Sequence, residues 1–289
     1  MLLLLCANVA LGFVAQPARH PFTIPHAVVD PVVAVAGAAG GLAAVNLLGG
    51  SSKKQAIDDK EEVETYFNGV GFGRWNRIYS ESEDVNTVQL DIRKGHAATI
   101  DRVLDWAGRD LADKTWCDLG CGVGSLAIPV AERGAAVSAS DISAAMVAET
   151  RRRAEDAGVR LADATTADME AVAGAFDVVS CVDVMIHYPT DKMKDLVDHL
   201  AGLSTDRLFV SFAPKTPQYQ LLKYIGGLFP GPSKTTRAYL HSEADVVDAL
   251  DKAGFDVQQQ HLTATNFYFS LLLEAKKRPA AAAAAAAGA

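Results

Sequence analysis

The ten-residue segment Trp116–Ser125 constrains the fold more than any other part of the chain. Its sequence, WCDLGCGVGS, predicts a buried strand that ends in a glycine-rich turn and opens a helix. Asp141 follows the first glycine by about twenty residues, after a second strand-like run at 135–140. Glycine lets a ligand approach the backbone, and an acid at the next strand tip can accept both ribose hydroxyls. These features predict a binding site for an adenosine-containing ligand.

The spacing of the glycines separates two kinds of ligand. Dinucleotide sites use G-x-G-x-x-G and place a pyrophosphate on the helix N-terminus. Here Gly120, Gly122 and Gly124 are spaced G-x-G-x-G, and Asp118 precedes them. A carboxylate there would repel a pyrophosphate but could hold the cationic amino-acid head of S-adenosylmethionine (SAM). The spacing resembles the first motif of class I SAM-dependent methyltransferases; a glycine turn without a ligand is the alternative interpretation.

Apolar runs and helical patterns alternate along the rest of the chain. Six candidate strands are expected at 115–119, 135–140, 176–182, 207–212, 256–262 and 267–274. Helices are expected near 86–108, 125–133, 144–157, 192–203 and 243–253, and an acidic, helix-prone segment spans 59–67. This alternation predicts an α/β fold whose mostly parallel sheet carries helices on both faces and ends in an antiparallel pair. It resembles the Rossmann-like class I methyltransferase fold, with a seven-stranded sheet and the ligand at the carboxyl ends of its strands.

The two ends of the chain are expected to lie outside this fold. Residues 1–58 are interpreted as a targeting presequence: residues 2–11 suit a signal-peptide core, and few acids follow. That order resembles the two-part presequences of algae with secondary plastids, and a simple secretory signal is the alternative. The apolar stretch 32–48 is short and weakly hydrophobic for a membrane span. The methyltransferase domain is expected over 59–277, followed by a low-complexity alanine tail at 278–289.

Charge and cysteine usage exclude some function classes. The net charge of −8 and the lack of a dense Lys/Arg stripe argue against nucleic-acid binding. The four cysteines have no metal-ligand spacing, so they are interpreted as reduced thiols and no metal site of the protein is predicted.

Two segments, about 60–80 and 214–240, interrupt the strand–helix alternation. The first is rich in aromatic residues and the second in glycine and proline. Long connections inside a compact domain are usually functional, so both are predicted to form a lid over an apolar ligand. The alternative is an ordinary long loop with a local hydrophobic cluster.

Several side chains are expected at the ligand edge of the sheet. Asp168 could accept a hydrogen bond from the adenine amino group, with Met169 against the ring; a plain helix N-cap is the alternative for Asp168. His187 follows a strand end and titrates near neutrality, so it could serve as a base or a hydrogen-bond donor, or be structural. The predicted cofactor-binding set is Asp118, Gly120, Gly122, Gly124, Asp141, Ile142, Asp168, Met169 and Cys181.

Five longer motifs permit a closer match. They are YFNGVGFGRWNRIY at 66–79, QLDIR at 89–93, DVMIHYP at 183–189, SFAPKT at 211–216 and IGGLFPGPSKTTRAY at 225–239. Together they resemble the magnesium-protoporphyrin IX O-methyltransferases of chlorophyll biosynthesis, over nearly all of 61–276.

The resemblance implies a reaction and a setting. The reaction is methyl transfer from SAM to the ring-C propionate carboxylate of magnesium protoporphyrin IX, with magnesium only as part of the substrate. Tyr79 and His187 are the catalytic residues that it implies. It also implies a plastid (chloroplast) location, in the stroma with thylakoid or envelope membrane association, and contact with the large subunit of magnesium chelatase.

Basic side chains could meet the second propionate of such a substrate. The candidates are Arg74, Arg93, Lys215, Lys234 and Arg237, each of which could equally be a solvated surface charge. Two rival functions remain at this point. One is a methyltransferase that acts on a quinone or a small phenol. The other is a pigment-pathway scaffold without turnover, against which the intact glycine turn and its two acids argue.

Overall fold

The computed structural model describes residues 52–80, 82–217, 219–220 and 238–279. The expected presequence up to residue 51, the apolar stretch at 32–48, Lys234, Arg237 and residues 280–289 lie outside the described residues. Within the described ranges, no helix combines the length and apolar character that crossing a membrane requires.

Seven strands form one sheet in the order β3-β2-β1-β4-β5-β7-β6. Neighbouring strands pair in parallel from β3 to β5, and β7 pairs antiparallel with both β5 and β6. The predicted seven-stranded, mostly parallel sheet and its antiparallel closing pair are confirmed. The strands are β1 (Thr115–Leu119), β2 (Ala136–Asp141), β3 (Asp163–Thr166), β4 (Phe176–Cys181), β5 (Ser204–Phe212), β6 (Phe255–Ala264) and β7 (Phe269–Lys277).

Strand β3 is the one absent from the six predicted strands. Its sequence is DATT, and only Ala164 among its four residues is buried. A short edge strand with one buried side chain produces no apolar run, so the hydrophobic pattern could not reveal it.

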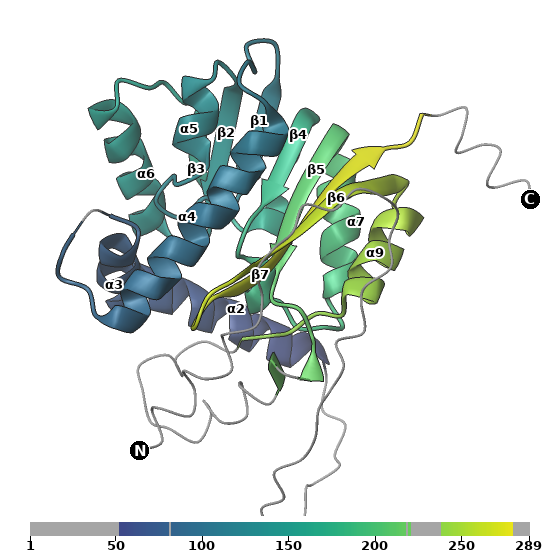
Figure 1. The fold of residues 1–289 in the computed structure, drawn as a ribbon, viewed down its shortest axis with the longest axis horizontal. Helices are drawn as coiled ribbons and strands as arrows, with labels where there is room; N and C mark the ends of the chain where they lie inside the picture. The colour runs from purple at the N-terminus through teal and green to yellow at the C-terminus, as the bar shows by residue number, and fades with distance from the viewer. Residues whose placement is uncertain (1–51, 81, 218, 221–237, 280–289) are drawn as a thin grey trace, which may run out of the picture. The chain divides into compact units, whose positions relative to one another are not determined.

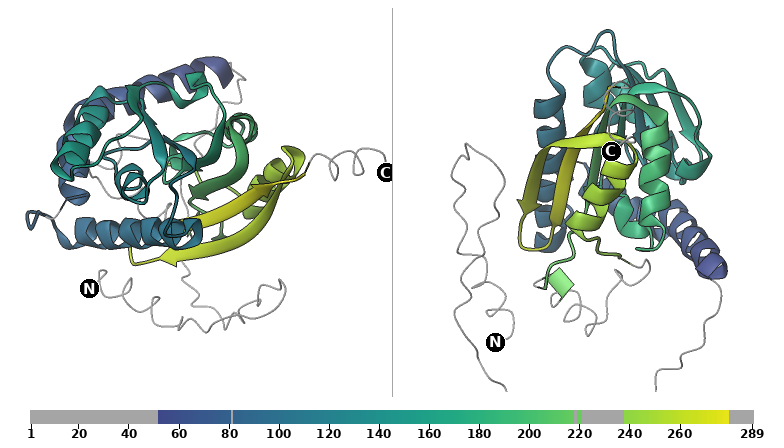
Figure 2. Two further views of the ribbon diagram at one scale, coloured as in Figure 1. Left: turned by 90° about the horizontal axis from the view of Figure 1, so that it is seen from above. Right: turned by 90° about the vertical axis from the view of Figure 1, so that its right-hand side faces the viewer.

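Helices cover both faces of the sheet (Figures 1 and 2). One core cluster joins α4 (Thr87–Ala107) and α5 (Ala127–Glu132) to the strands, and the other joins α7 (Met193–Leu203) and α9 (Glu243–Lys252) to them. Helix α6 (Ala144–Asp156) contacts β2 and β3. The expected arrangement with helices on both faces is confirmed.

Two helices lie below the sheet in Figure 1, where the parallel strands end: α2 (Ser52–Asn68) and α3 (Val70–Ile78). Helix α2 begins seven residues before the helix-prone segment that the sequence predicted at 59–67. The aromatic segment interpreted as a lid therefore consists of the end of α2 and all of α3. Short 3-10 turns η1 (Met169–Ala171) and η2 (Met185–His187) follow β3 and β4.

Candidate active site

A cavity of about 940 Å³ opens at the carboxyl ends of the parallel strands. Its described walls come from α2, α3, α4, the glycine turn, η1, η2 and the β6–β7 hairpin, and include Phe67, Trp75, Tyr79, Asp118, Asp141 and His187. A volume of this size lies at the upper end of the range for small-molecule sites. The cavity therefore brings the predicted cofactor and catalytic residues to one place.

The glycine turn forms part of the cavity wall. Gly120 has a φ of 73° and Gly122 one of 54°, in the left-handed region that favours glycine. The amides of Gly120 and Cys121 both donate to the carbonyl of Ser140, at 2.8 and 2.9 Å, which ties the turn to β2. Gly124 shares the positive φ but does not line the cavity, so its role here is in the chain reversal before α5.

Replacing Gly120 by alanine is expected to destabilise the fold by about 2–4 kcal/mol, since a left-handed backbone and a steric overlap act together. A Cβ at Gly120 would lie 2.3 Å from the Cγ2 methyl of Val184. Gly158→Ala is the matched control, because its φ is 67° and a Cβ there would meet nothing within 4 Å. Denaturant unfolding should show a larger loss for Gly120→Ala; equal losses would mean that Val184 moves aside without cost.

Asp118 presents a buried carboxylate to the cavity. Its Oδ1 accepts a 2.7 Å hydrogen bond from the Ser180 hydroxyl, which in turn accepts from the Trp116 indole at 2.8 Å. Burial raises the pKa of Asp118 to about 6, against the smaller lowering effect of Ser180. A buried acid of this kind is stabilised by a cationic ligand.

Asp141, at the end of β2, also lines the cavity. Its two carboxylate oxygens accept from the amides of Gly122 and Ser143, each at 2.9 Å. Burial raises its pKa, and the two amides oppose that rise. Ile142 lies beside it in the wall. Because each carboxylate oxygen has a further lone pair, Asp141 can still accept hydrogen bonds from a ligand.

Asp168 and Met169 line the same cavity beside η1. Asp168 acts as the N-cap of η1, accepting from the amide of Glu170 at 3.1 Å, as the alternative interpretation expected. Its other oxygen lies 2.8 Å from the Lys60 ammonium, which also pairs with Glu170 at 2.7 Å. This contact ties α2 to the loop after β3.

Cys181 does not line the cavity. Its side chain is fully buried in the core, where burial raises the pKa of the thiol. The chain reaches the cavity wall one residue later, at Val182 and Asp183. The Cys181 side chain therefore packs in the core, and its predicted contact with the cofactor stays a prediction.

Tyr79 and His187 face the cavity from different elements. Tyr79 caps the C-terminus of α3, with its ring 5.3 Å from the Trp75 ring and 4.2 Å from the His96 imidazole. His187 ends η2 and packs against the edge of Phe67 at 5.5 Å. Burial lowers the pKa of His187 to about 4 and raises that of Tyr79 well above its usual value. Both side chains are therefore neutral at physiological pH.

The predicted propionate-binding residues differ in whether they line the cavity. Arg74 lines the cavity, makes no ion pair within the described ranges, and has a buried Nε without a hydrogen-bond partner. The Arg93 guanidinium instead donates to the carbonyls of Ile78, Arg77 and Ser82 at 2.6–2.8 Å, away from the cavity wall. Lys215 is exposed and does not line the cavity. Of the described candidates, Arg74 alone is placed to meet a ligand in this cavity.

Comparison with known proteins decides the family. A chloroplastic magnesium protoporphyrin IX methyltransferase from Arabidopsis thaliana is 53% identical over 221 residues, which cover 75% of this chain and 71% of the relative. A magnesium-protoporphyrin O-methyltransferase from Synechocystis PCC 6803 is 50% identical over 76% of this chain and 97% of its own. The chain belongs to the magnesium-protoporphyrin IX methyltransferase family.

Family models and solved structures agree with this membership. The model described as the C-terminus of magnesium-protoporphyrin IX methyltransferase matches residues 181–277, and a general methyltransferase domain model matches 117–204. The crystal structure of the Synechocystis enzyme with bound S-adenosylhomocysteine (SAH) matches with a TM-score of 0.69 and 46% identity, over 76% of this chain and all of that one. The predicted resemblance and the class I methyltransferase fold are confirmed.

Asp183 and His96 are polar residues of the cavity that were not among the predicted site residues. The Asp183 carboxylate accepts from His96 at 2.8 Å, Tyr268 at 2.7 Å, Ser270 at 2.9 Å and Ser211 at 3.0 Å. Burial would raise the pKa of Asp183, but these donors, His96 first, hold it below its usual value. His96 leaves its Nε2 buried and without a partner. In this member of the magnesium-protoporphyrin IX methyltransferase family, the pair therefore adds a buried charge beside Tyr79 and His187.

Proposed function

We propose that this protein transfers the methyl group of SAM to the ring-C propionate carboxylate of magnesium protoporphyrin IX, in chlorophyll biosynthesis. The observation that carries the proposal is one large cavity in which Asp118, Asp141 and the glycine turn lie beside the aromatic wall that holds Tyr79 and His187. Family membership supports the substrate, because the Arabidopsis and Synechocystis relatives bear its name.

SAM is the co-substrate, and it supplies an electrophilic methyl group on its sulfonium sulfur. The residues of the cavity fit such a molecule: the buried carboxylate of Asp118 suits a cationic amino-acid head, and Asp141 suits ribose hydroxyls. Gly122 leaves the backbone open, since a Cβ there would meet nothing within 4 Å. Two structures of the Synechocystis enzyme, one with SAM and one with SAH, further support this assignment.

The propionate is ionised at neutral pH, so the reaction needs no strong base. What it requires is a carboxylate that has lost its water and points at the methyl group. Tyr79 keeps its hydroxyl proton because its pKa is raised, and His187 is neutral because burial lowers its pKa to about 4. We assign both to hydrogen bonding and alignment of the carboxylate. Arg74 is assigned to the second propionate, since it lines the cavity, its guanidinium lies over the Trp75 ring at 5.6 Å, and its buried Nε has no hydrogen-bond partner within the described ranges.

A plastid location follows from the same proposal, and the chloroplastic Arabidopsis relative supports it. The stroma with thylakoid or envelope association, a plastid of secondary origin, and contact with the large subunit of magnesium chelatase are the finer parts of the proposal. They rest on the family motifs and on the composition of residues 1–58.

SAM affinity is expected to rise with pH until about pH 6 and then level off. Asp118 is protonated below its pKa of about 6, so binding a cation there requires the loss of a proton. The expected slope below pH 6 approaches tenfold per pH unit, as one coupled proton requires. Calorimetric titration with SAM from pH 5 to pH 8 measures it. Asp118→Asn should bind about 10- to 100-fold more weakly and lose the slope; a slope retained in that variant would assign it to another group.

A substrate competition tests the proposed function against its rivals. The protein is given SAM with an equimolar mixture of magnesium protoporphyrin IX and a catechol precursor of a quinone, and the methylated products are separated by chromatography. Methylation of the porphyrin alone supports the proposal. Preference for the catechol would assign the protein to the quinone or phenol methyltransferases, and SAM binding without any product would favour a scaffold.

A further inference from the structure

We infer that Arg153 of α6 is a positioning residue that holds Tyr79 in place for methyl transfer. The inference rests on the proposed function, because it gives Tyr79 a part in aligning the substrate carboxylate. Arg153 lies outside the cavity wall and was not among the predicted site residues. Its influence therefore has to pass through the groups that it holds.

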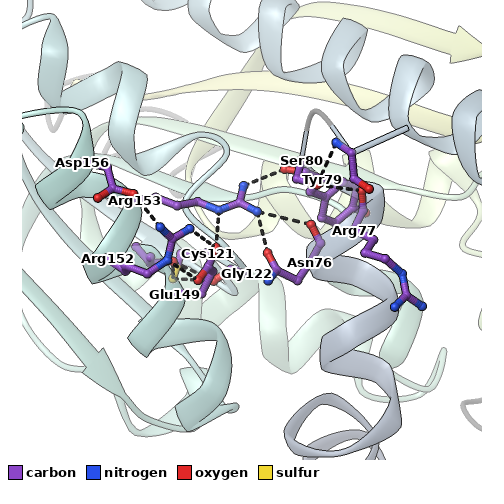
Figure 3. A network of polar contacts seen from close by, with 12 residues as sticks. Asn76, Arg77, Tyr79, Ser80, Cys121, Gly122, Glu149, Arg152, Arg153 and Asp156 are labelled. Atoms are coloured by element: carbon purple, nitrogen blue, oxygen red, sulfur yellow. Dashed lines mark hydrogen bonds and ion pairs between the residues drawn. The ribbon is translucent and has the colours of Figure 1, made fainter. Parts of the chain in front are cut away.

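Arg153 completes the C-terminus of α3. The last carbonyls of a helix have no partner within it and need donors from elsewhere. The Arg153 guanidinium donates to the carbonyl of Tyr79 at 2.6 Å and to the carbonyl and side-chain oxygens of Asn76 at 3.3 and 2.6 Å. Figure 3 shows this side chain reaching from α6 to the end of α3. The backbone of Tyr79 is thereby fixed to a helix of the main fold.

Glu149 fixes the guanidinium itself. Its Oε1 lies 2.8 Å from the Nε of Arg153, one helical turn away, and only 8% of the Glu149 side chain is exposed. Hydrogen bonds from Arg152 and then Arg153 lower the pKa of Glu149 to about 2, against the opposing effect of burial. Arg153 is therefore held by a carboxylate that stays ionised, which leaves its other two nitrogens directed at α3.

The same helix holds the cofactor side of the cavity. Thr150 donates from its hydroxyl to the carbonyl of Gly122 at 2.7 Å, and the Gly122 amide donates to Asp141. At the start of α6, the Ser143 hydroxyl contacts the carbonyl of Phe67 and the side chain of Asn68, at the end of α2. One helix thus fixes the glycine turn, the end of α2 and the end of α3 relative to one another. Loss of Arg153 would release only the end of α3, because the glycine turn and the end of α2 are held by Thr150 and Ser143.

Arg152 provides a matched control on the neighbouring residue. It also binds Glu149, but its other partner is Asp156, and Figure 3 shows it directed away from α3. Its side chain is 58% exposed, against 19% for Arg153. Arg152→Met and Arg153→Met therefore each remove a guanidinium that binds Glu149. Arg152→Met also removes the pair with Asp156, and only Arg153→Met removes the contact with α3.

The test compares both variants with Arg153→Lys, Tyr79→Phe and the double variant Arg153→Met/Tyr79→Phe in methyl transfer from SAM to magnesium protoporphyrin IX. We expect Arg153→Met to lower kcat by about 10- to 100-fold, as a misplaced catalytic group does, with a SAM Kd within about twofold of the parent. Arg153→Lys should recover part of the loss, and Arg152→Met should resemble the parent protein. The double variant should be little worse than Tyr79→Phe, because residues that act through one group are not additive.

Hydrogen–deuterium exchange of residues 70–80 supplies a readout that does not need activity. Exchange should rise in Arg153→Met and not in Arg152→Met, whichever substrate the enzyme takes. A parent protein that fails to methylate the porphyrin would overturn the proposed function, while exchange would still report on the tie to α3. Equal exchange and equal kcat in Arg152→Met and Arg153→Met would overturn the inference. So would a double variant whose loss of kcat is the product of the two single losses, or a loss of SAM affinity in Arg153→Met as large as its loss of kcat. If Arg153→Met fails to fold, Asn76→Ala removes one of the three hydrogen bonds between Arg153 and α3, the one to the Asn76 side chain, and must show the same pattern with smaller changes.

Discussion

Replacing His187 by alanine is expected to lower kcat by about 100- to 1,000-fold, which is the range for loss of a positioned catalytic group. His187 ends η2 and lines the cavity next to Phe67, where burial lowers its pKa to about 4. The neutral imidazole can therefore donate a hydrogen bond to the substrate carboxylate without a proton being gained first. Steady-state kinetics with magnesium protoporphyrin IX, together with the SAM Kd from calorimetry, measure the effect.

Two further variants make the His187 result specific. His187→Gln keeps a hydrogen-bond donor at the same place and should retain more activity than alanine. His261→Ala is the control, because His261 lies on β6 outside the cavity wall and should leave turnover unchanged. A loss of SAM affinity that matches the loss of kcat would show that His187 supports the cofactor site and not the methyl acceptor.

Replacing Asp183 by alanine is expected to cost about 3–5 kcal/mol of folding free energy, the range for removal of one partner from a buried charged pair. Four donors would lose their acceptor: the side chains of His96, Tyr268, Ser211 and Ser270. Asp183 also has a φ of 61°, which asparagine adopts more readily than alanine. Chemical unfolding should therefore rank Asp183→Asn between the parent and Asp183→Ala. A loss below about 1 kcal/mol for alanine would show that the donors find other partners.

The stability that Asp183 contributes should also depend on pH. Its folded pKa lies below the unfolded value of about 4, so the contribution is complete above that value and is lost as the pH falls through the folded pKa. Unfolding measured from pH 6 to pH 2 should show a smaller acid-dependent loss in Asp183→Asn than in the parent. An equal acid dependence in the two proteins would contradict the low pKa assigned to Asp183.

The parts of the fold that the sequence predicted are those with a local signal. The glycine turn was predictable because G-x-G-x-G with a preceding acid requires a particular backbone and a particular ligand charge. Helix α3 was not predicted, since its sequence VGFGRWNRI contains two glycines, which are poor helix formers. It forms because tertiary contacts hold it: Arg93 binds the carbonyls of Ile78 and Arg77, and Arg153 binds the carbonyls of Asn76 and Tyr79.

The missed residues of the site depend on contacts between distant parts of the chain. His96 lies in the middle of α4, and no local pattern connects it with Asp183, 87 residues later. Tyr268 reaches the same carboxylate from the β6–β7 hairpin and packs against Gly95, where an added Cβ would lie 2.3 Å from its ring. Arg93 was instead assigned to the site although it lies outside the cavity wall. It is a basic residue in a distinctive motif, which suggested a contact with a propionate, but its guanidinium donates to backbone carbonyls. Motif position alone could not separate these two roles.

Methylation of the propionate carboxylate can be detected by the mass of the pigment. The protein is incubated with SAM and magnesium protoporphyrin IX, with metal-free protoporphyrin in parallel, and the pigments are analysed by mass spectrometry before and after mild alkaline hydrolysis. We expect the magnesium porphyrin to gain the mass of a single CH₂ group and alkali to remove it, because the product is a methyl ester. No gain in mass despite measurable SAM binding, or a methyl group that survives alkali, would contradict methylation of a propionate carboxylate.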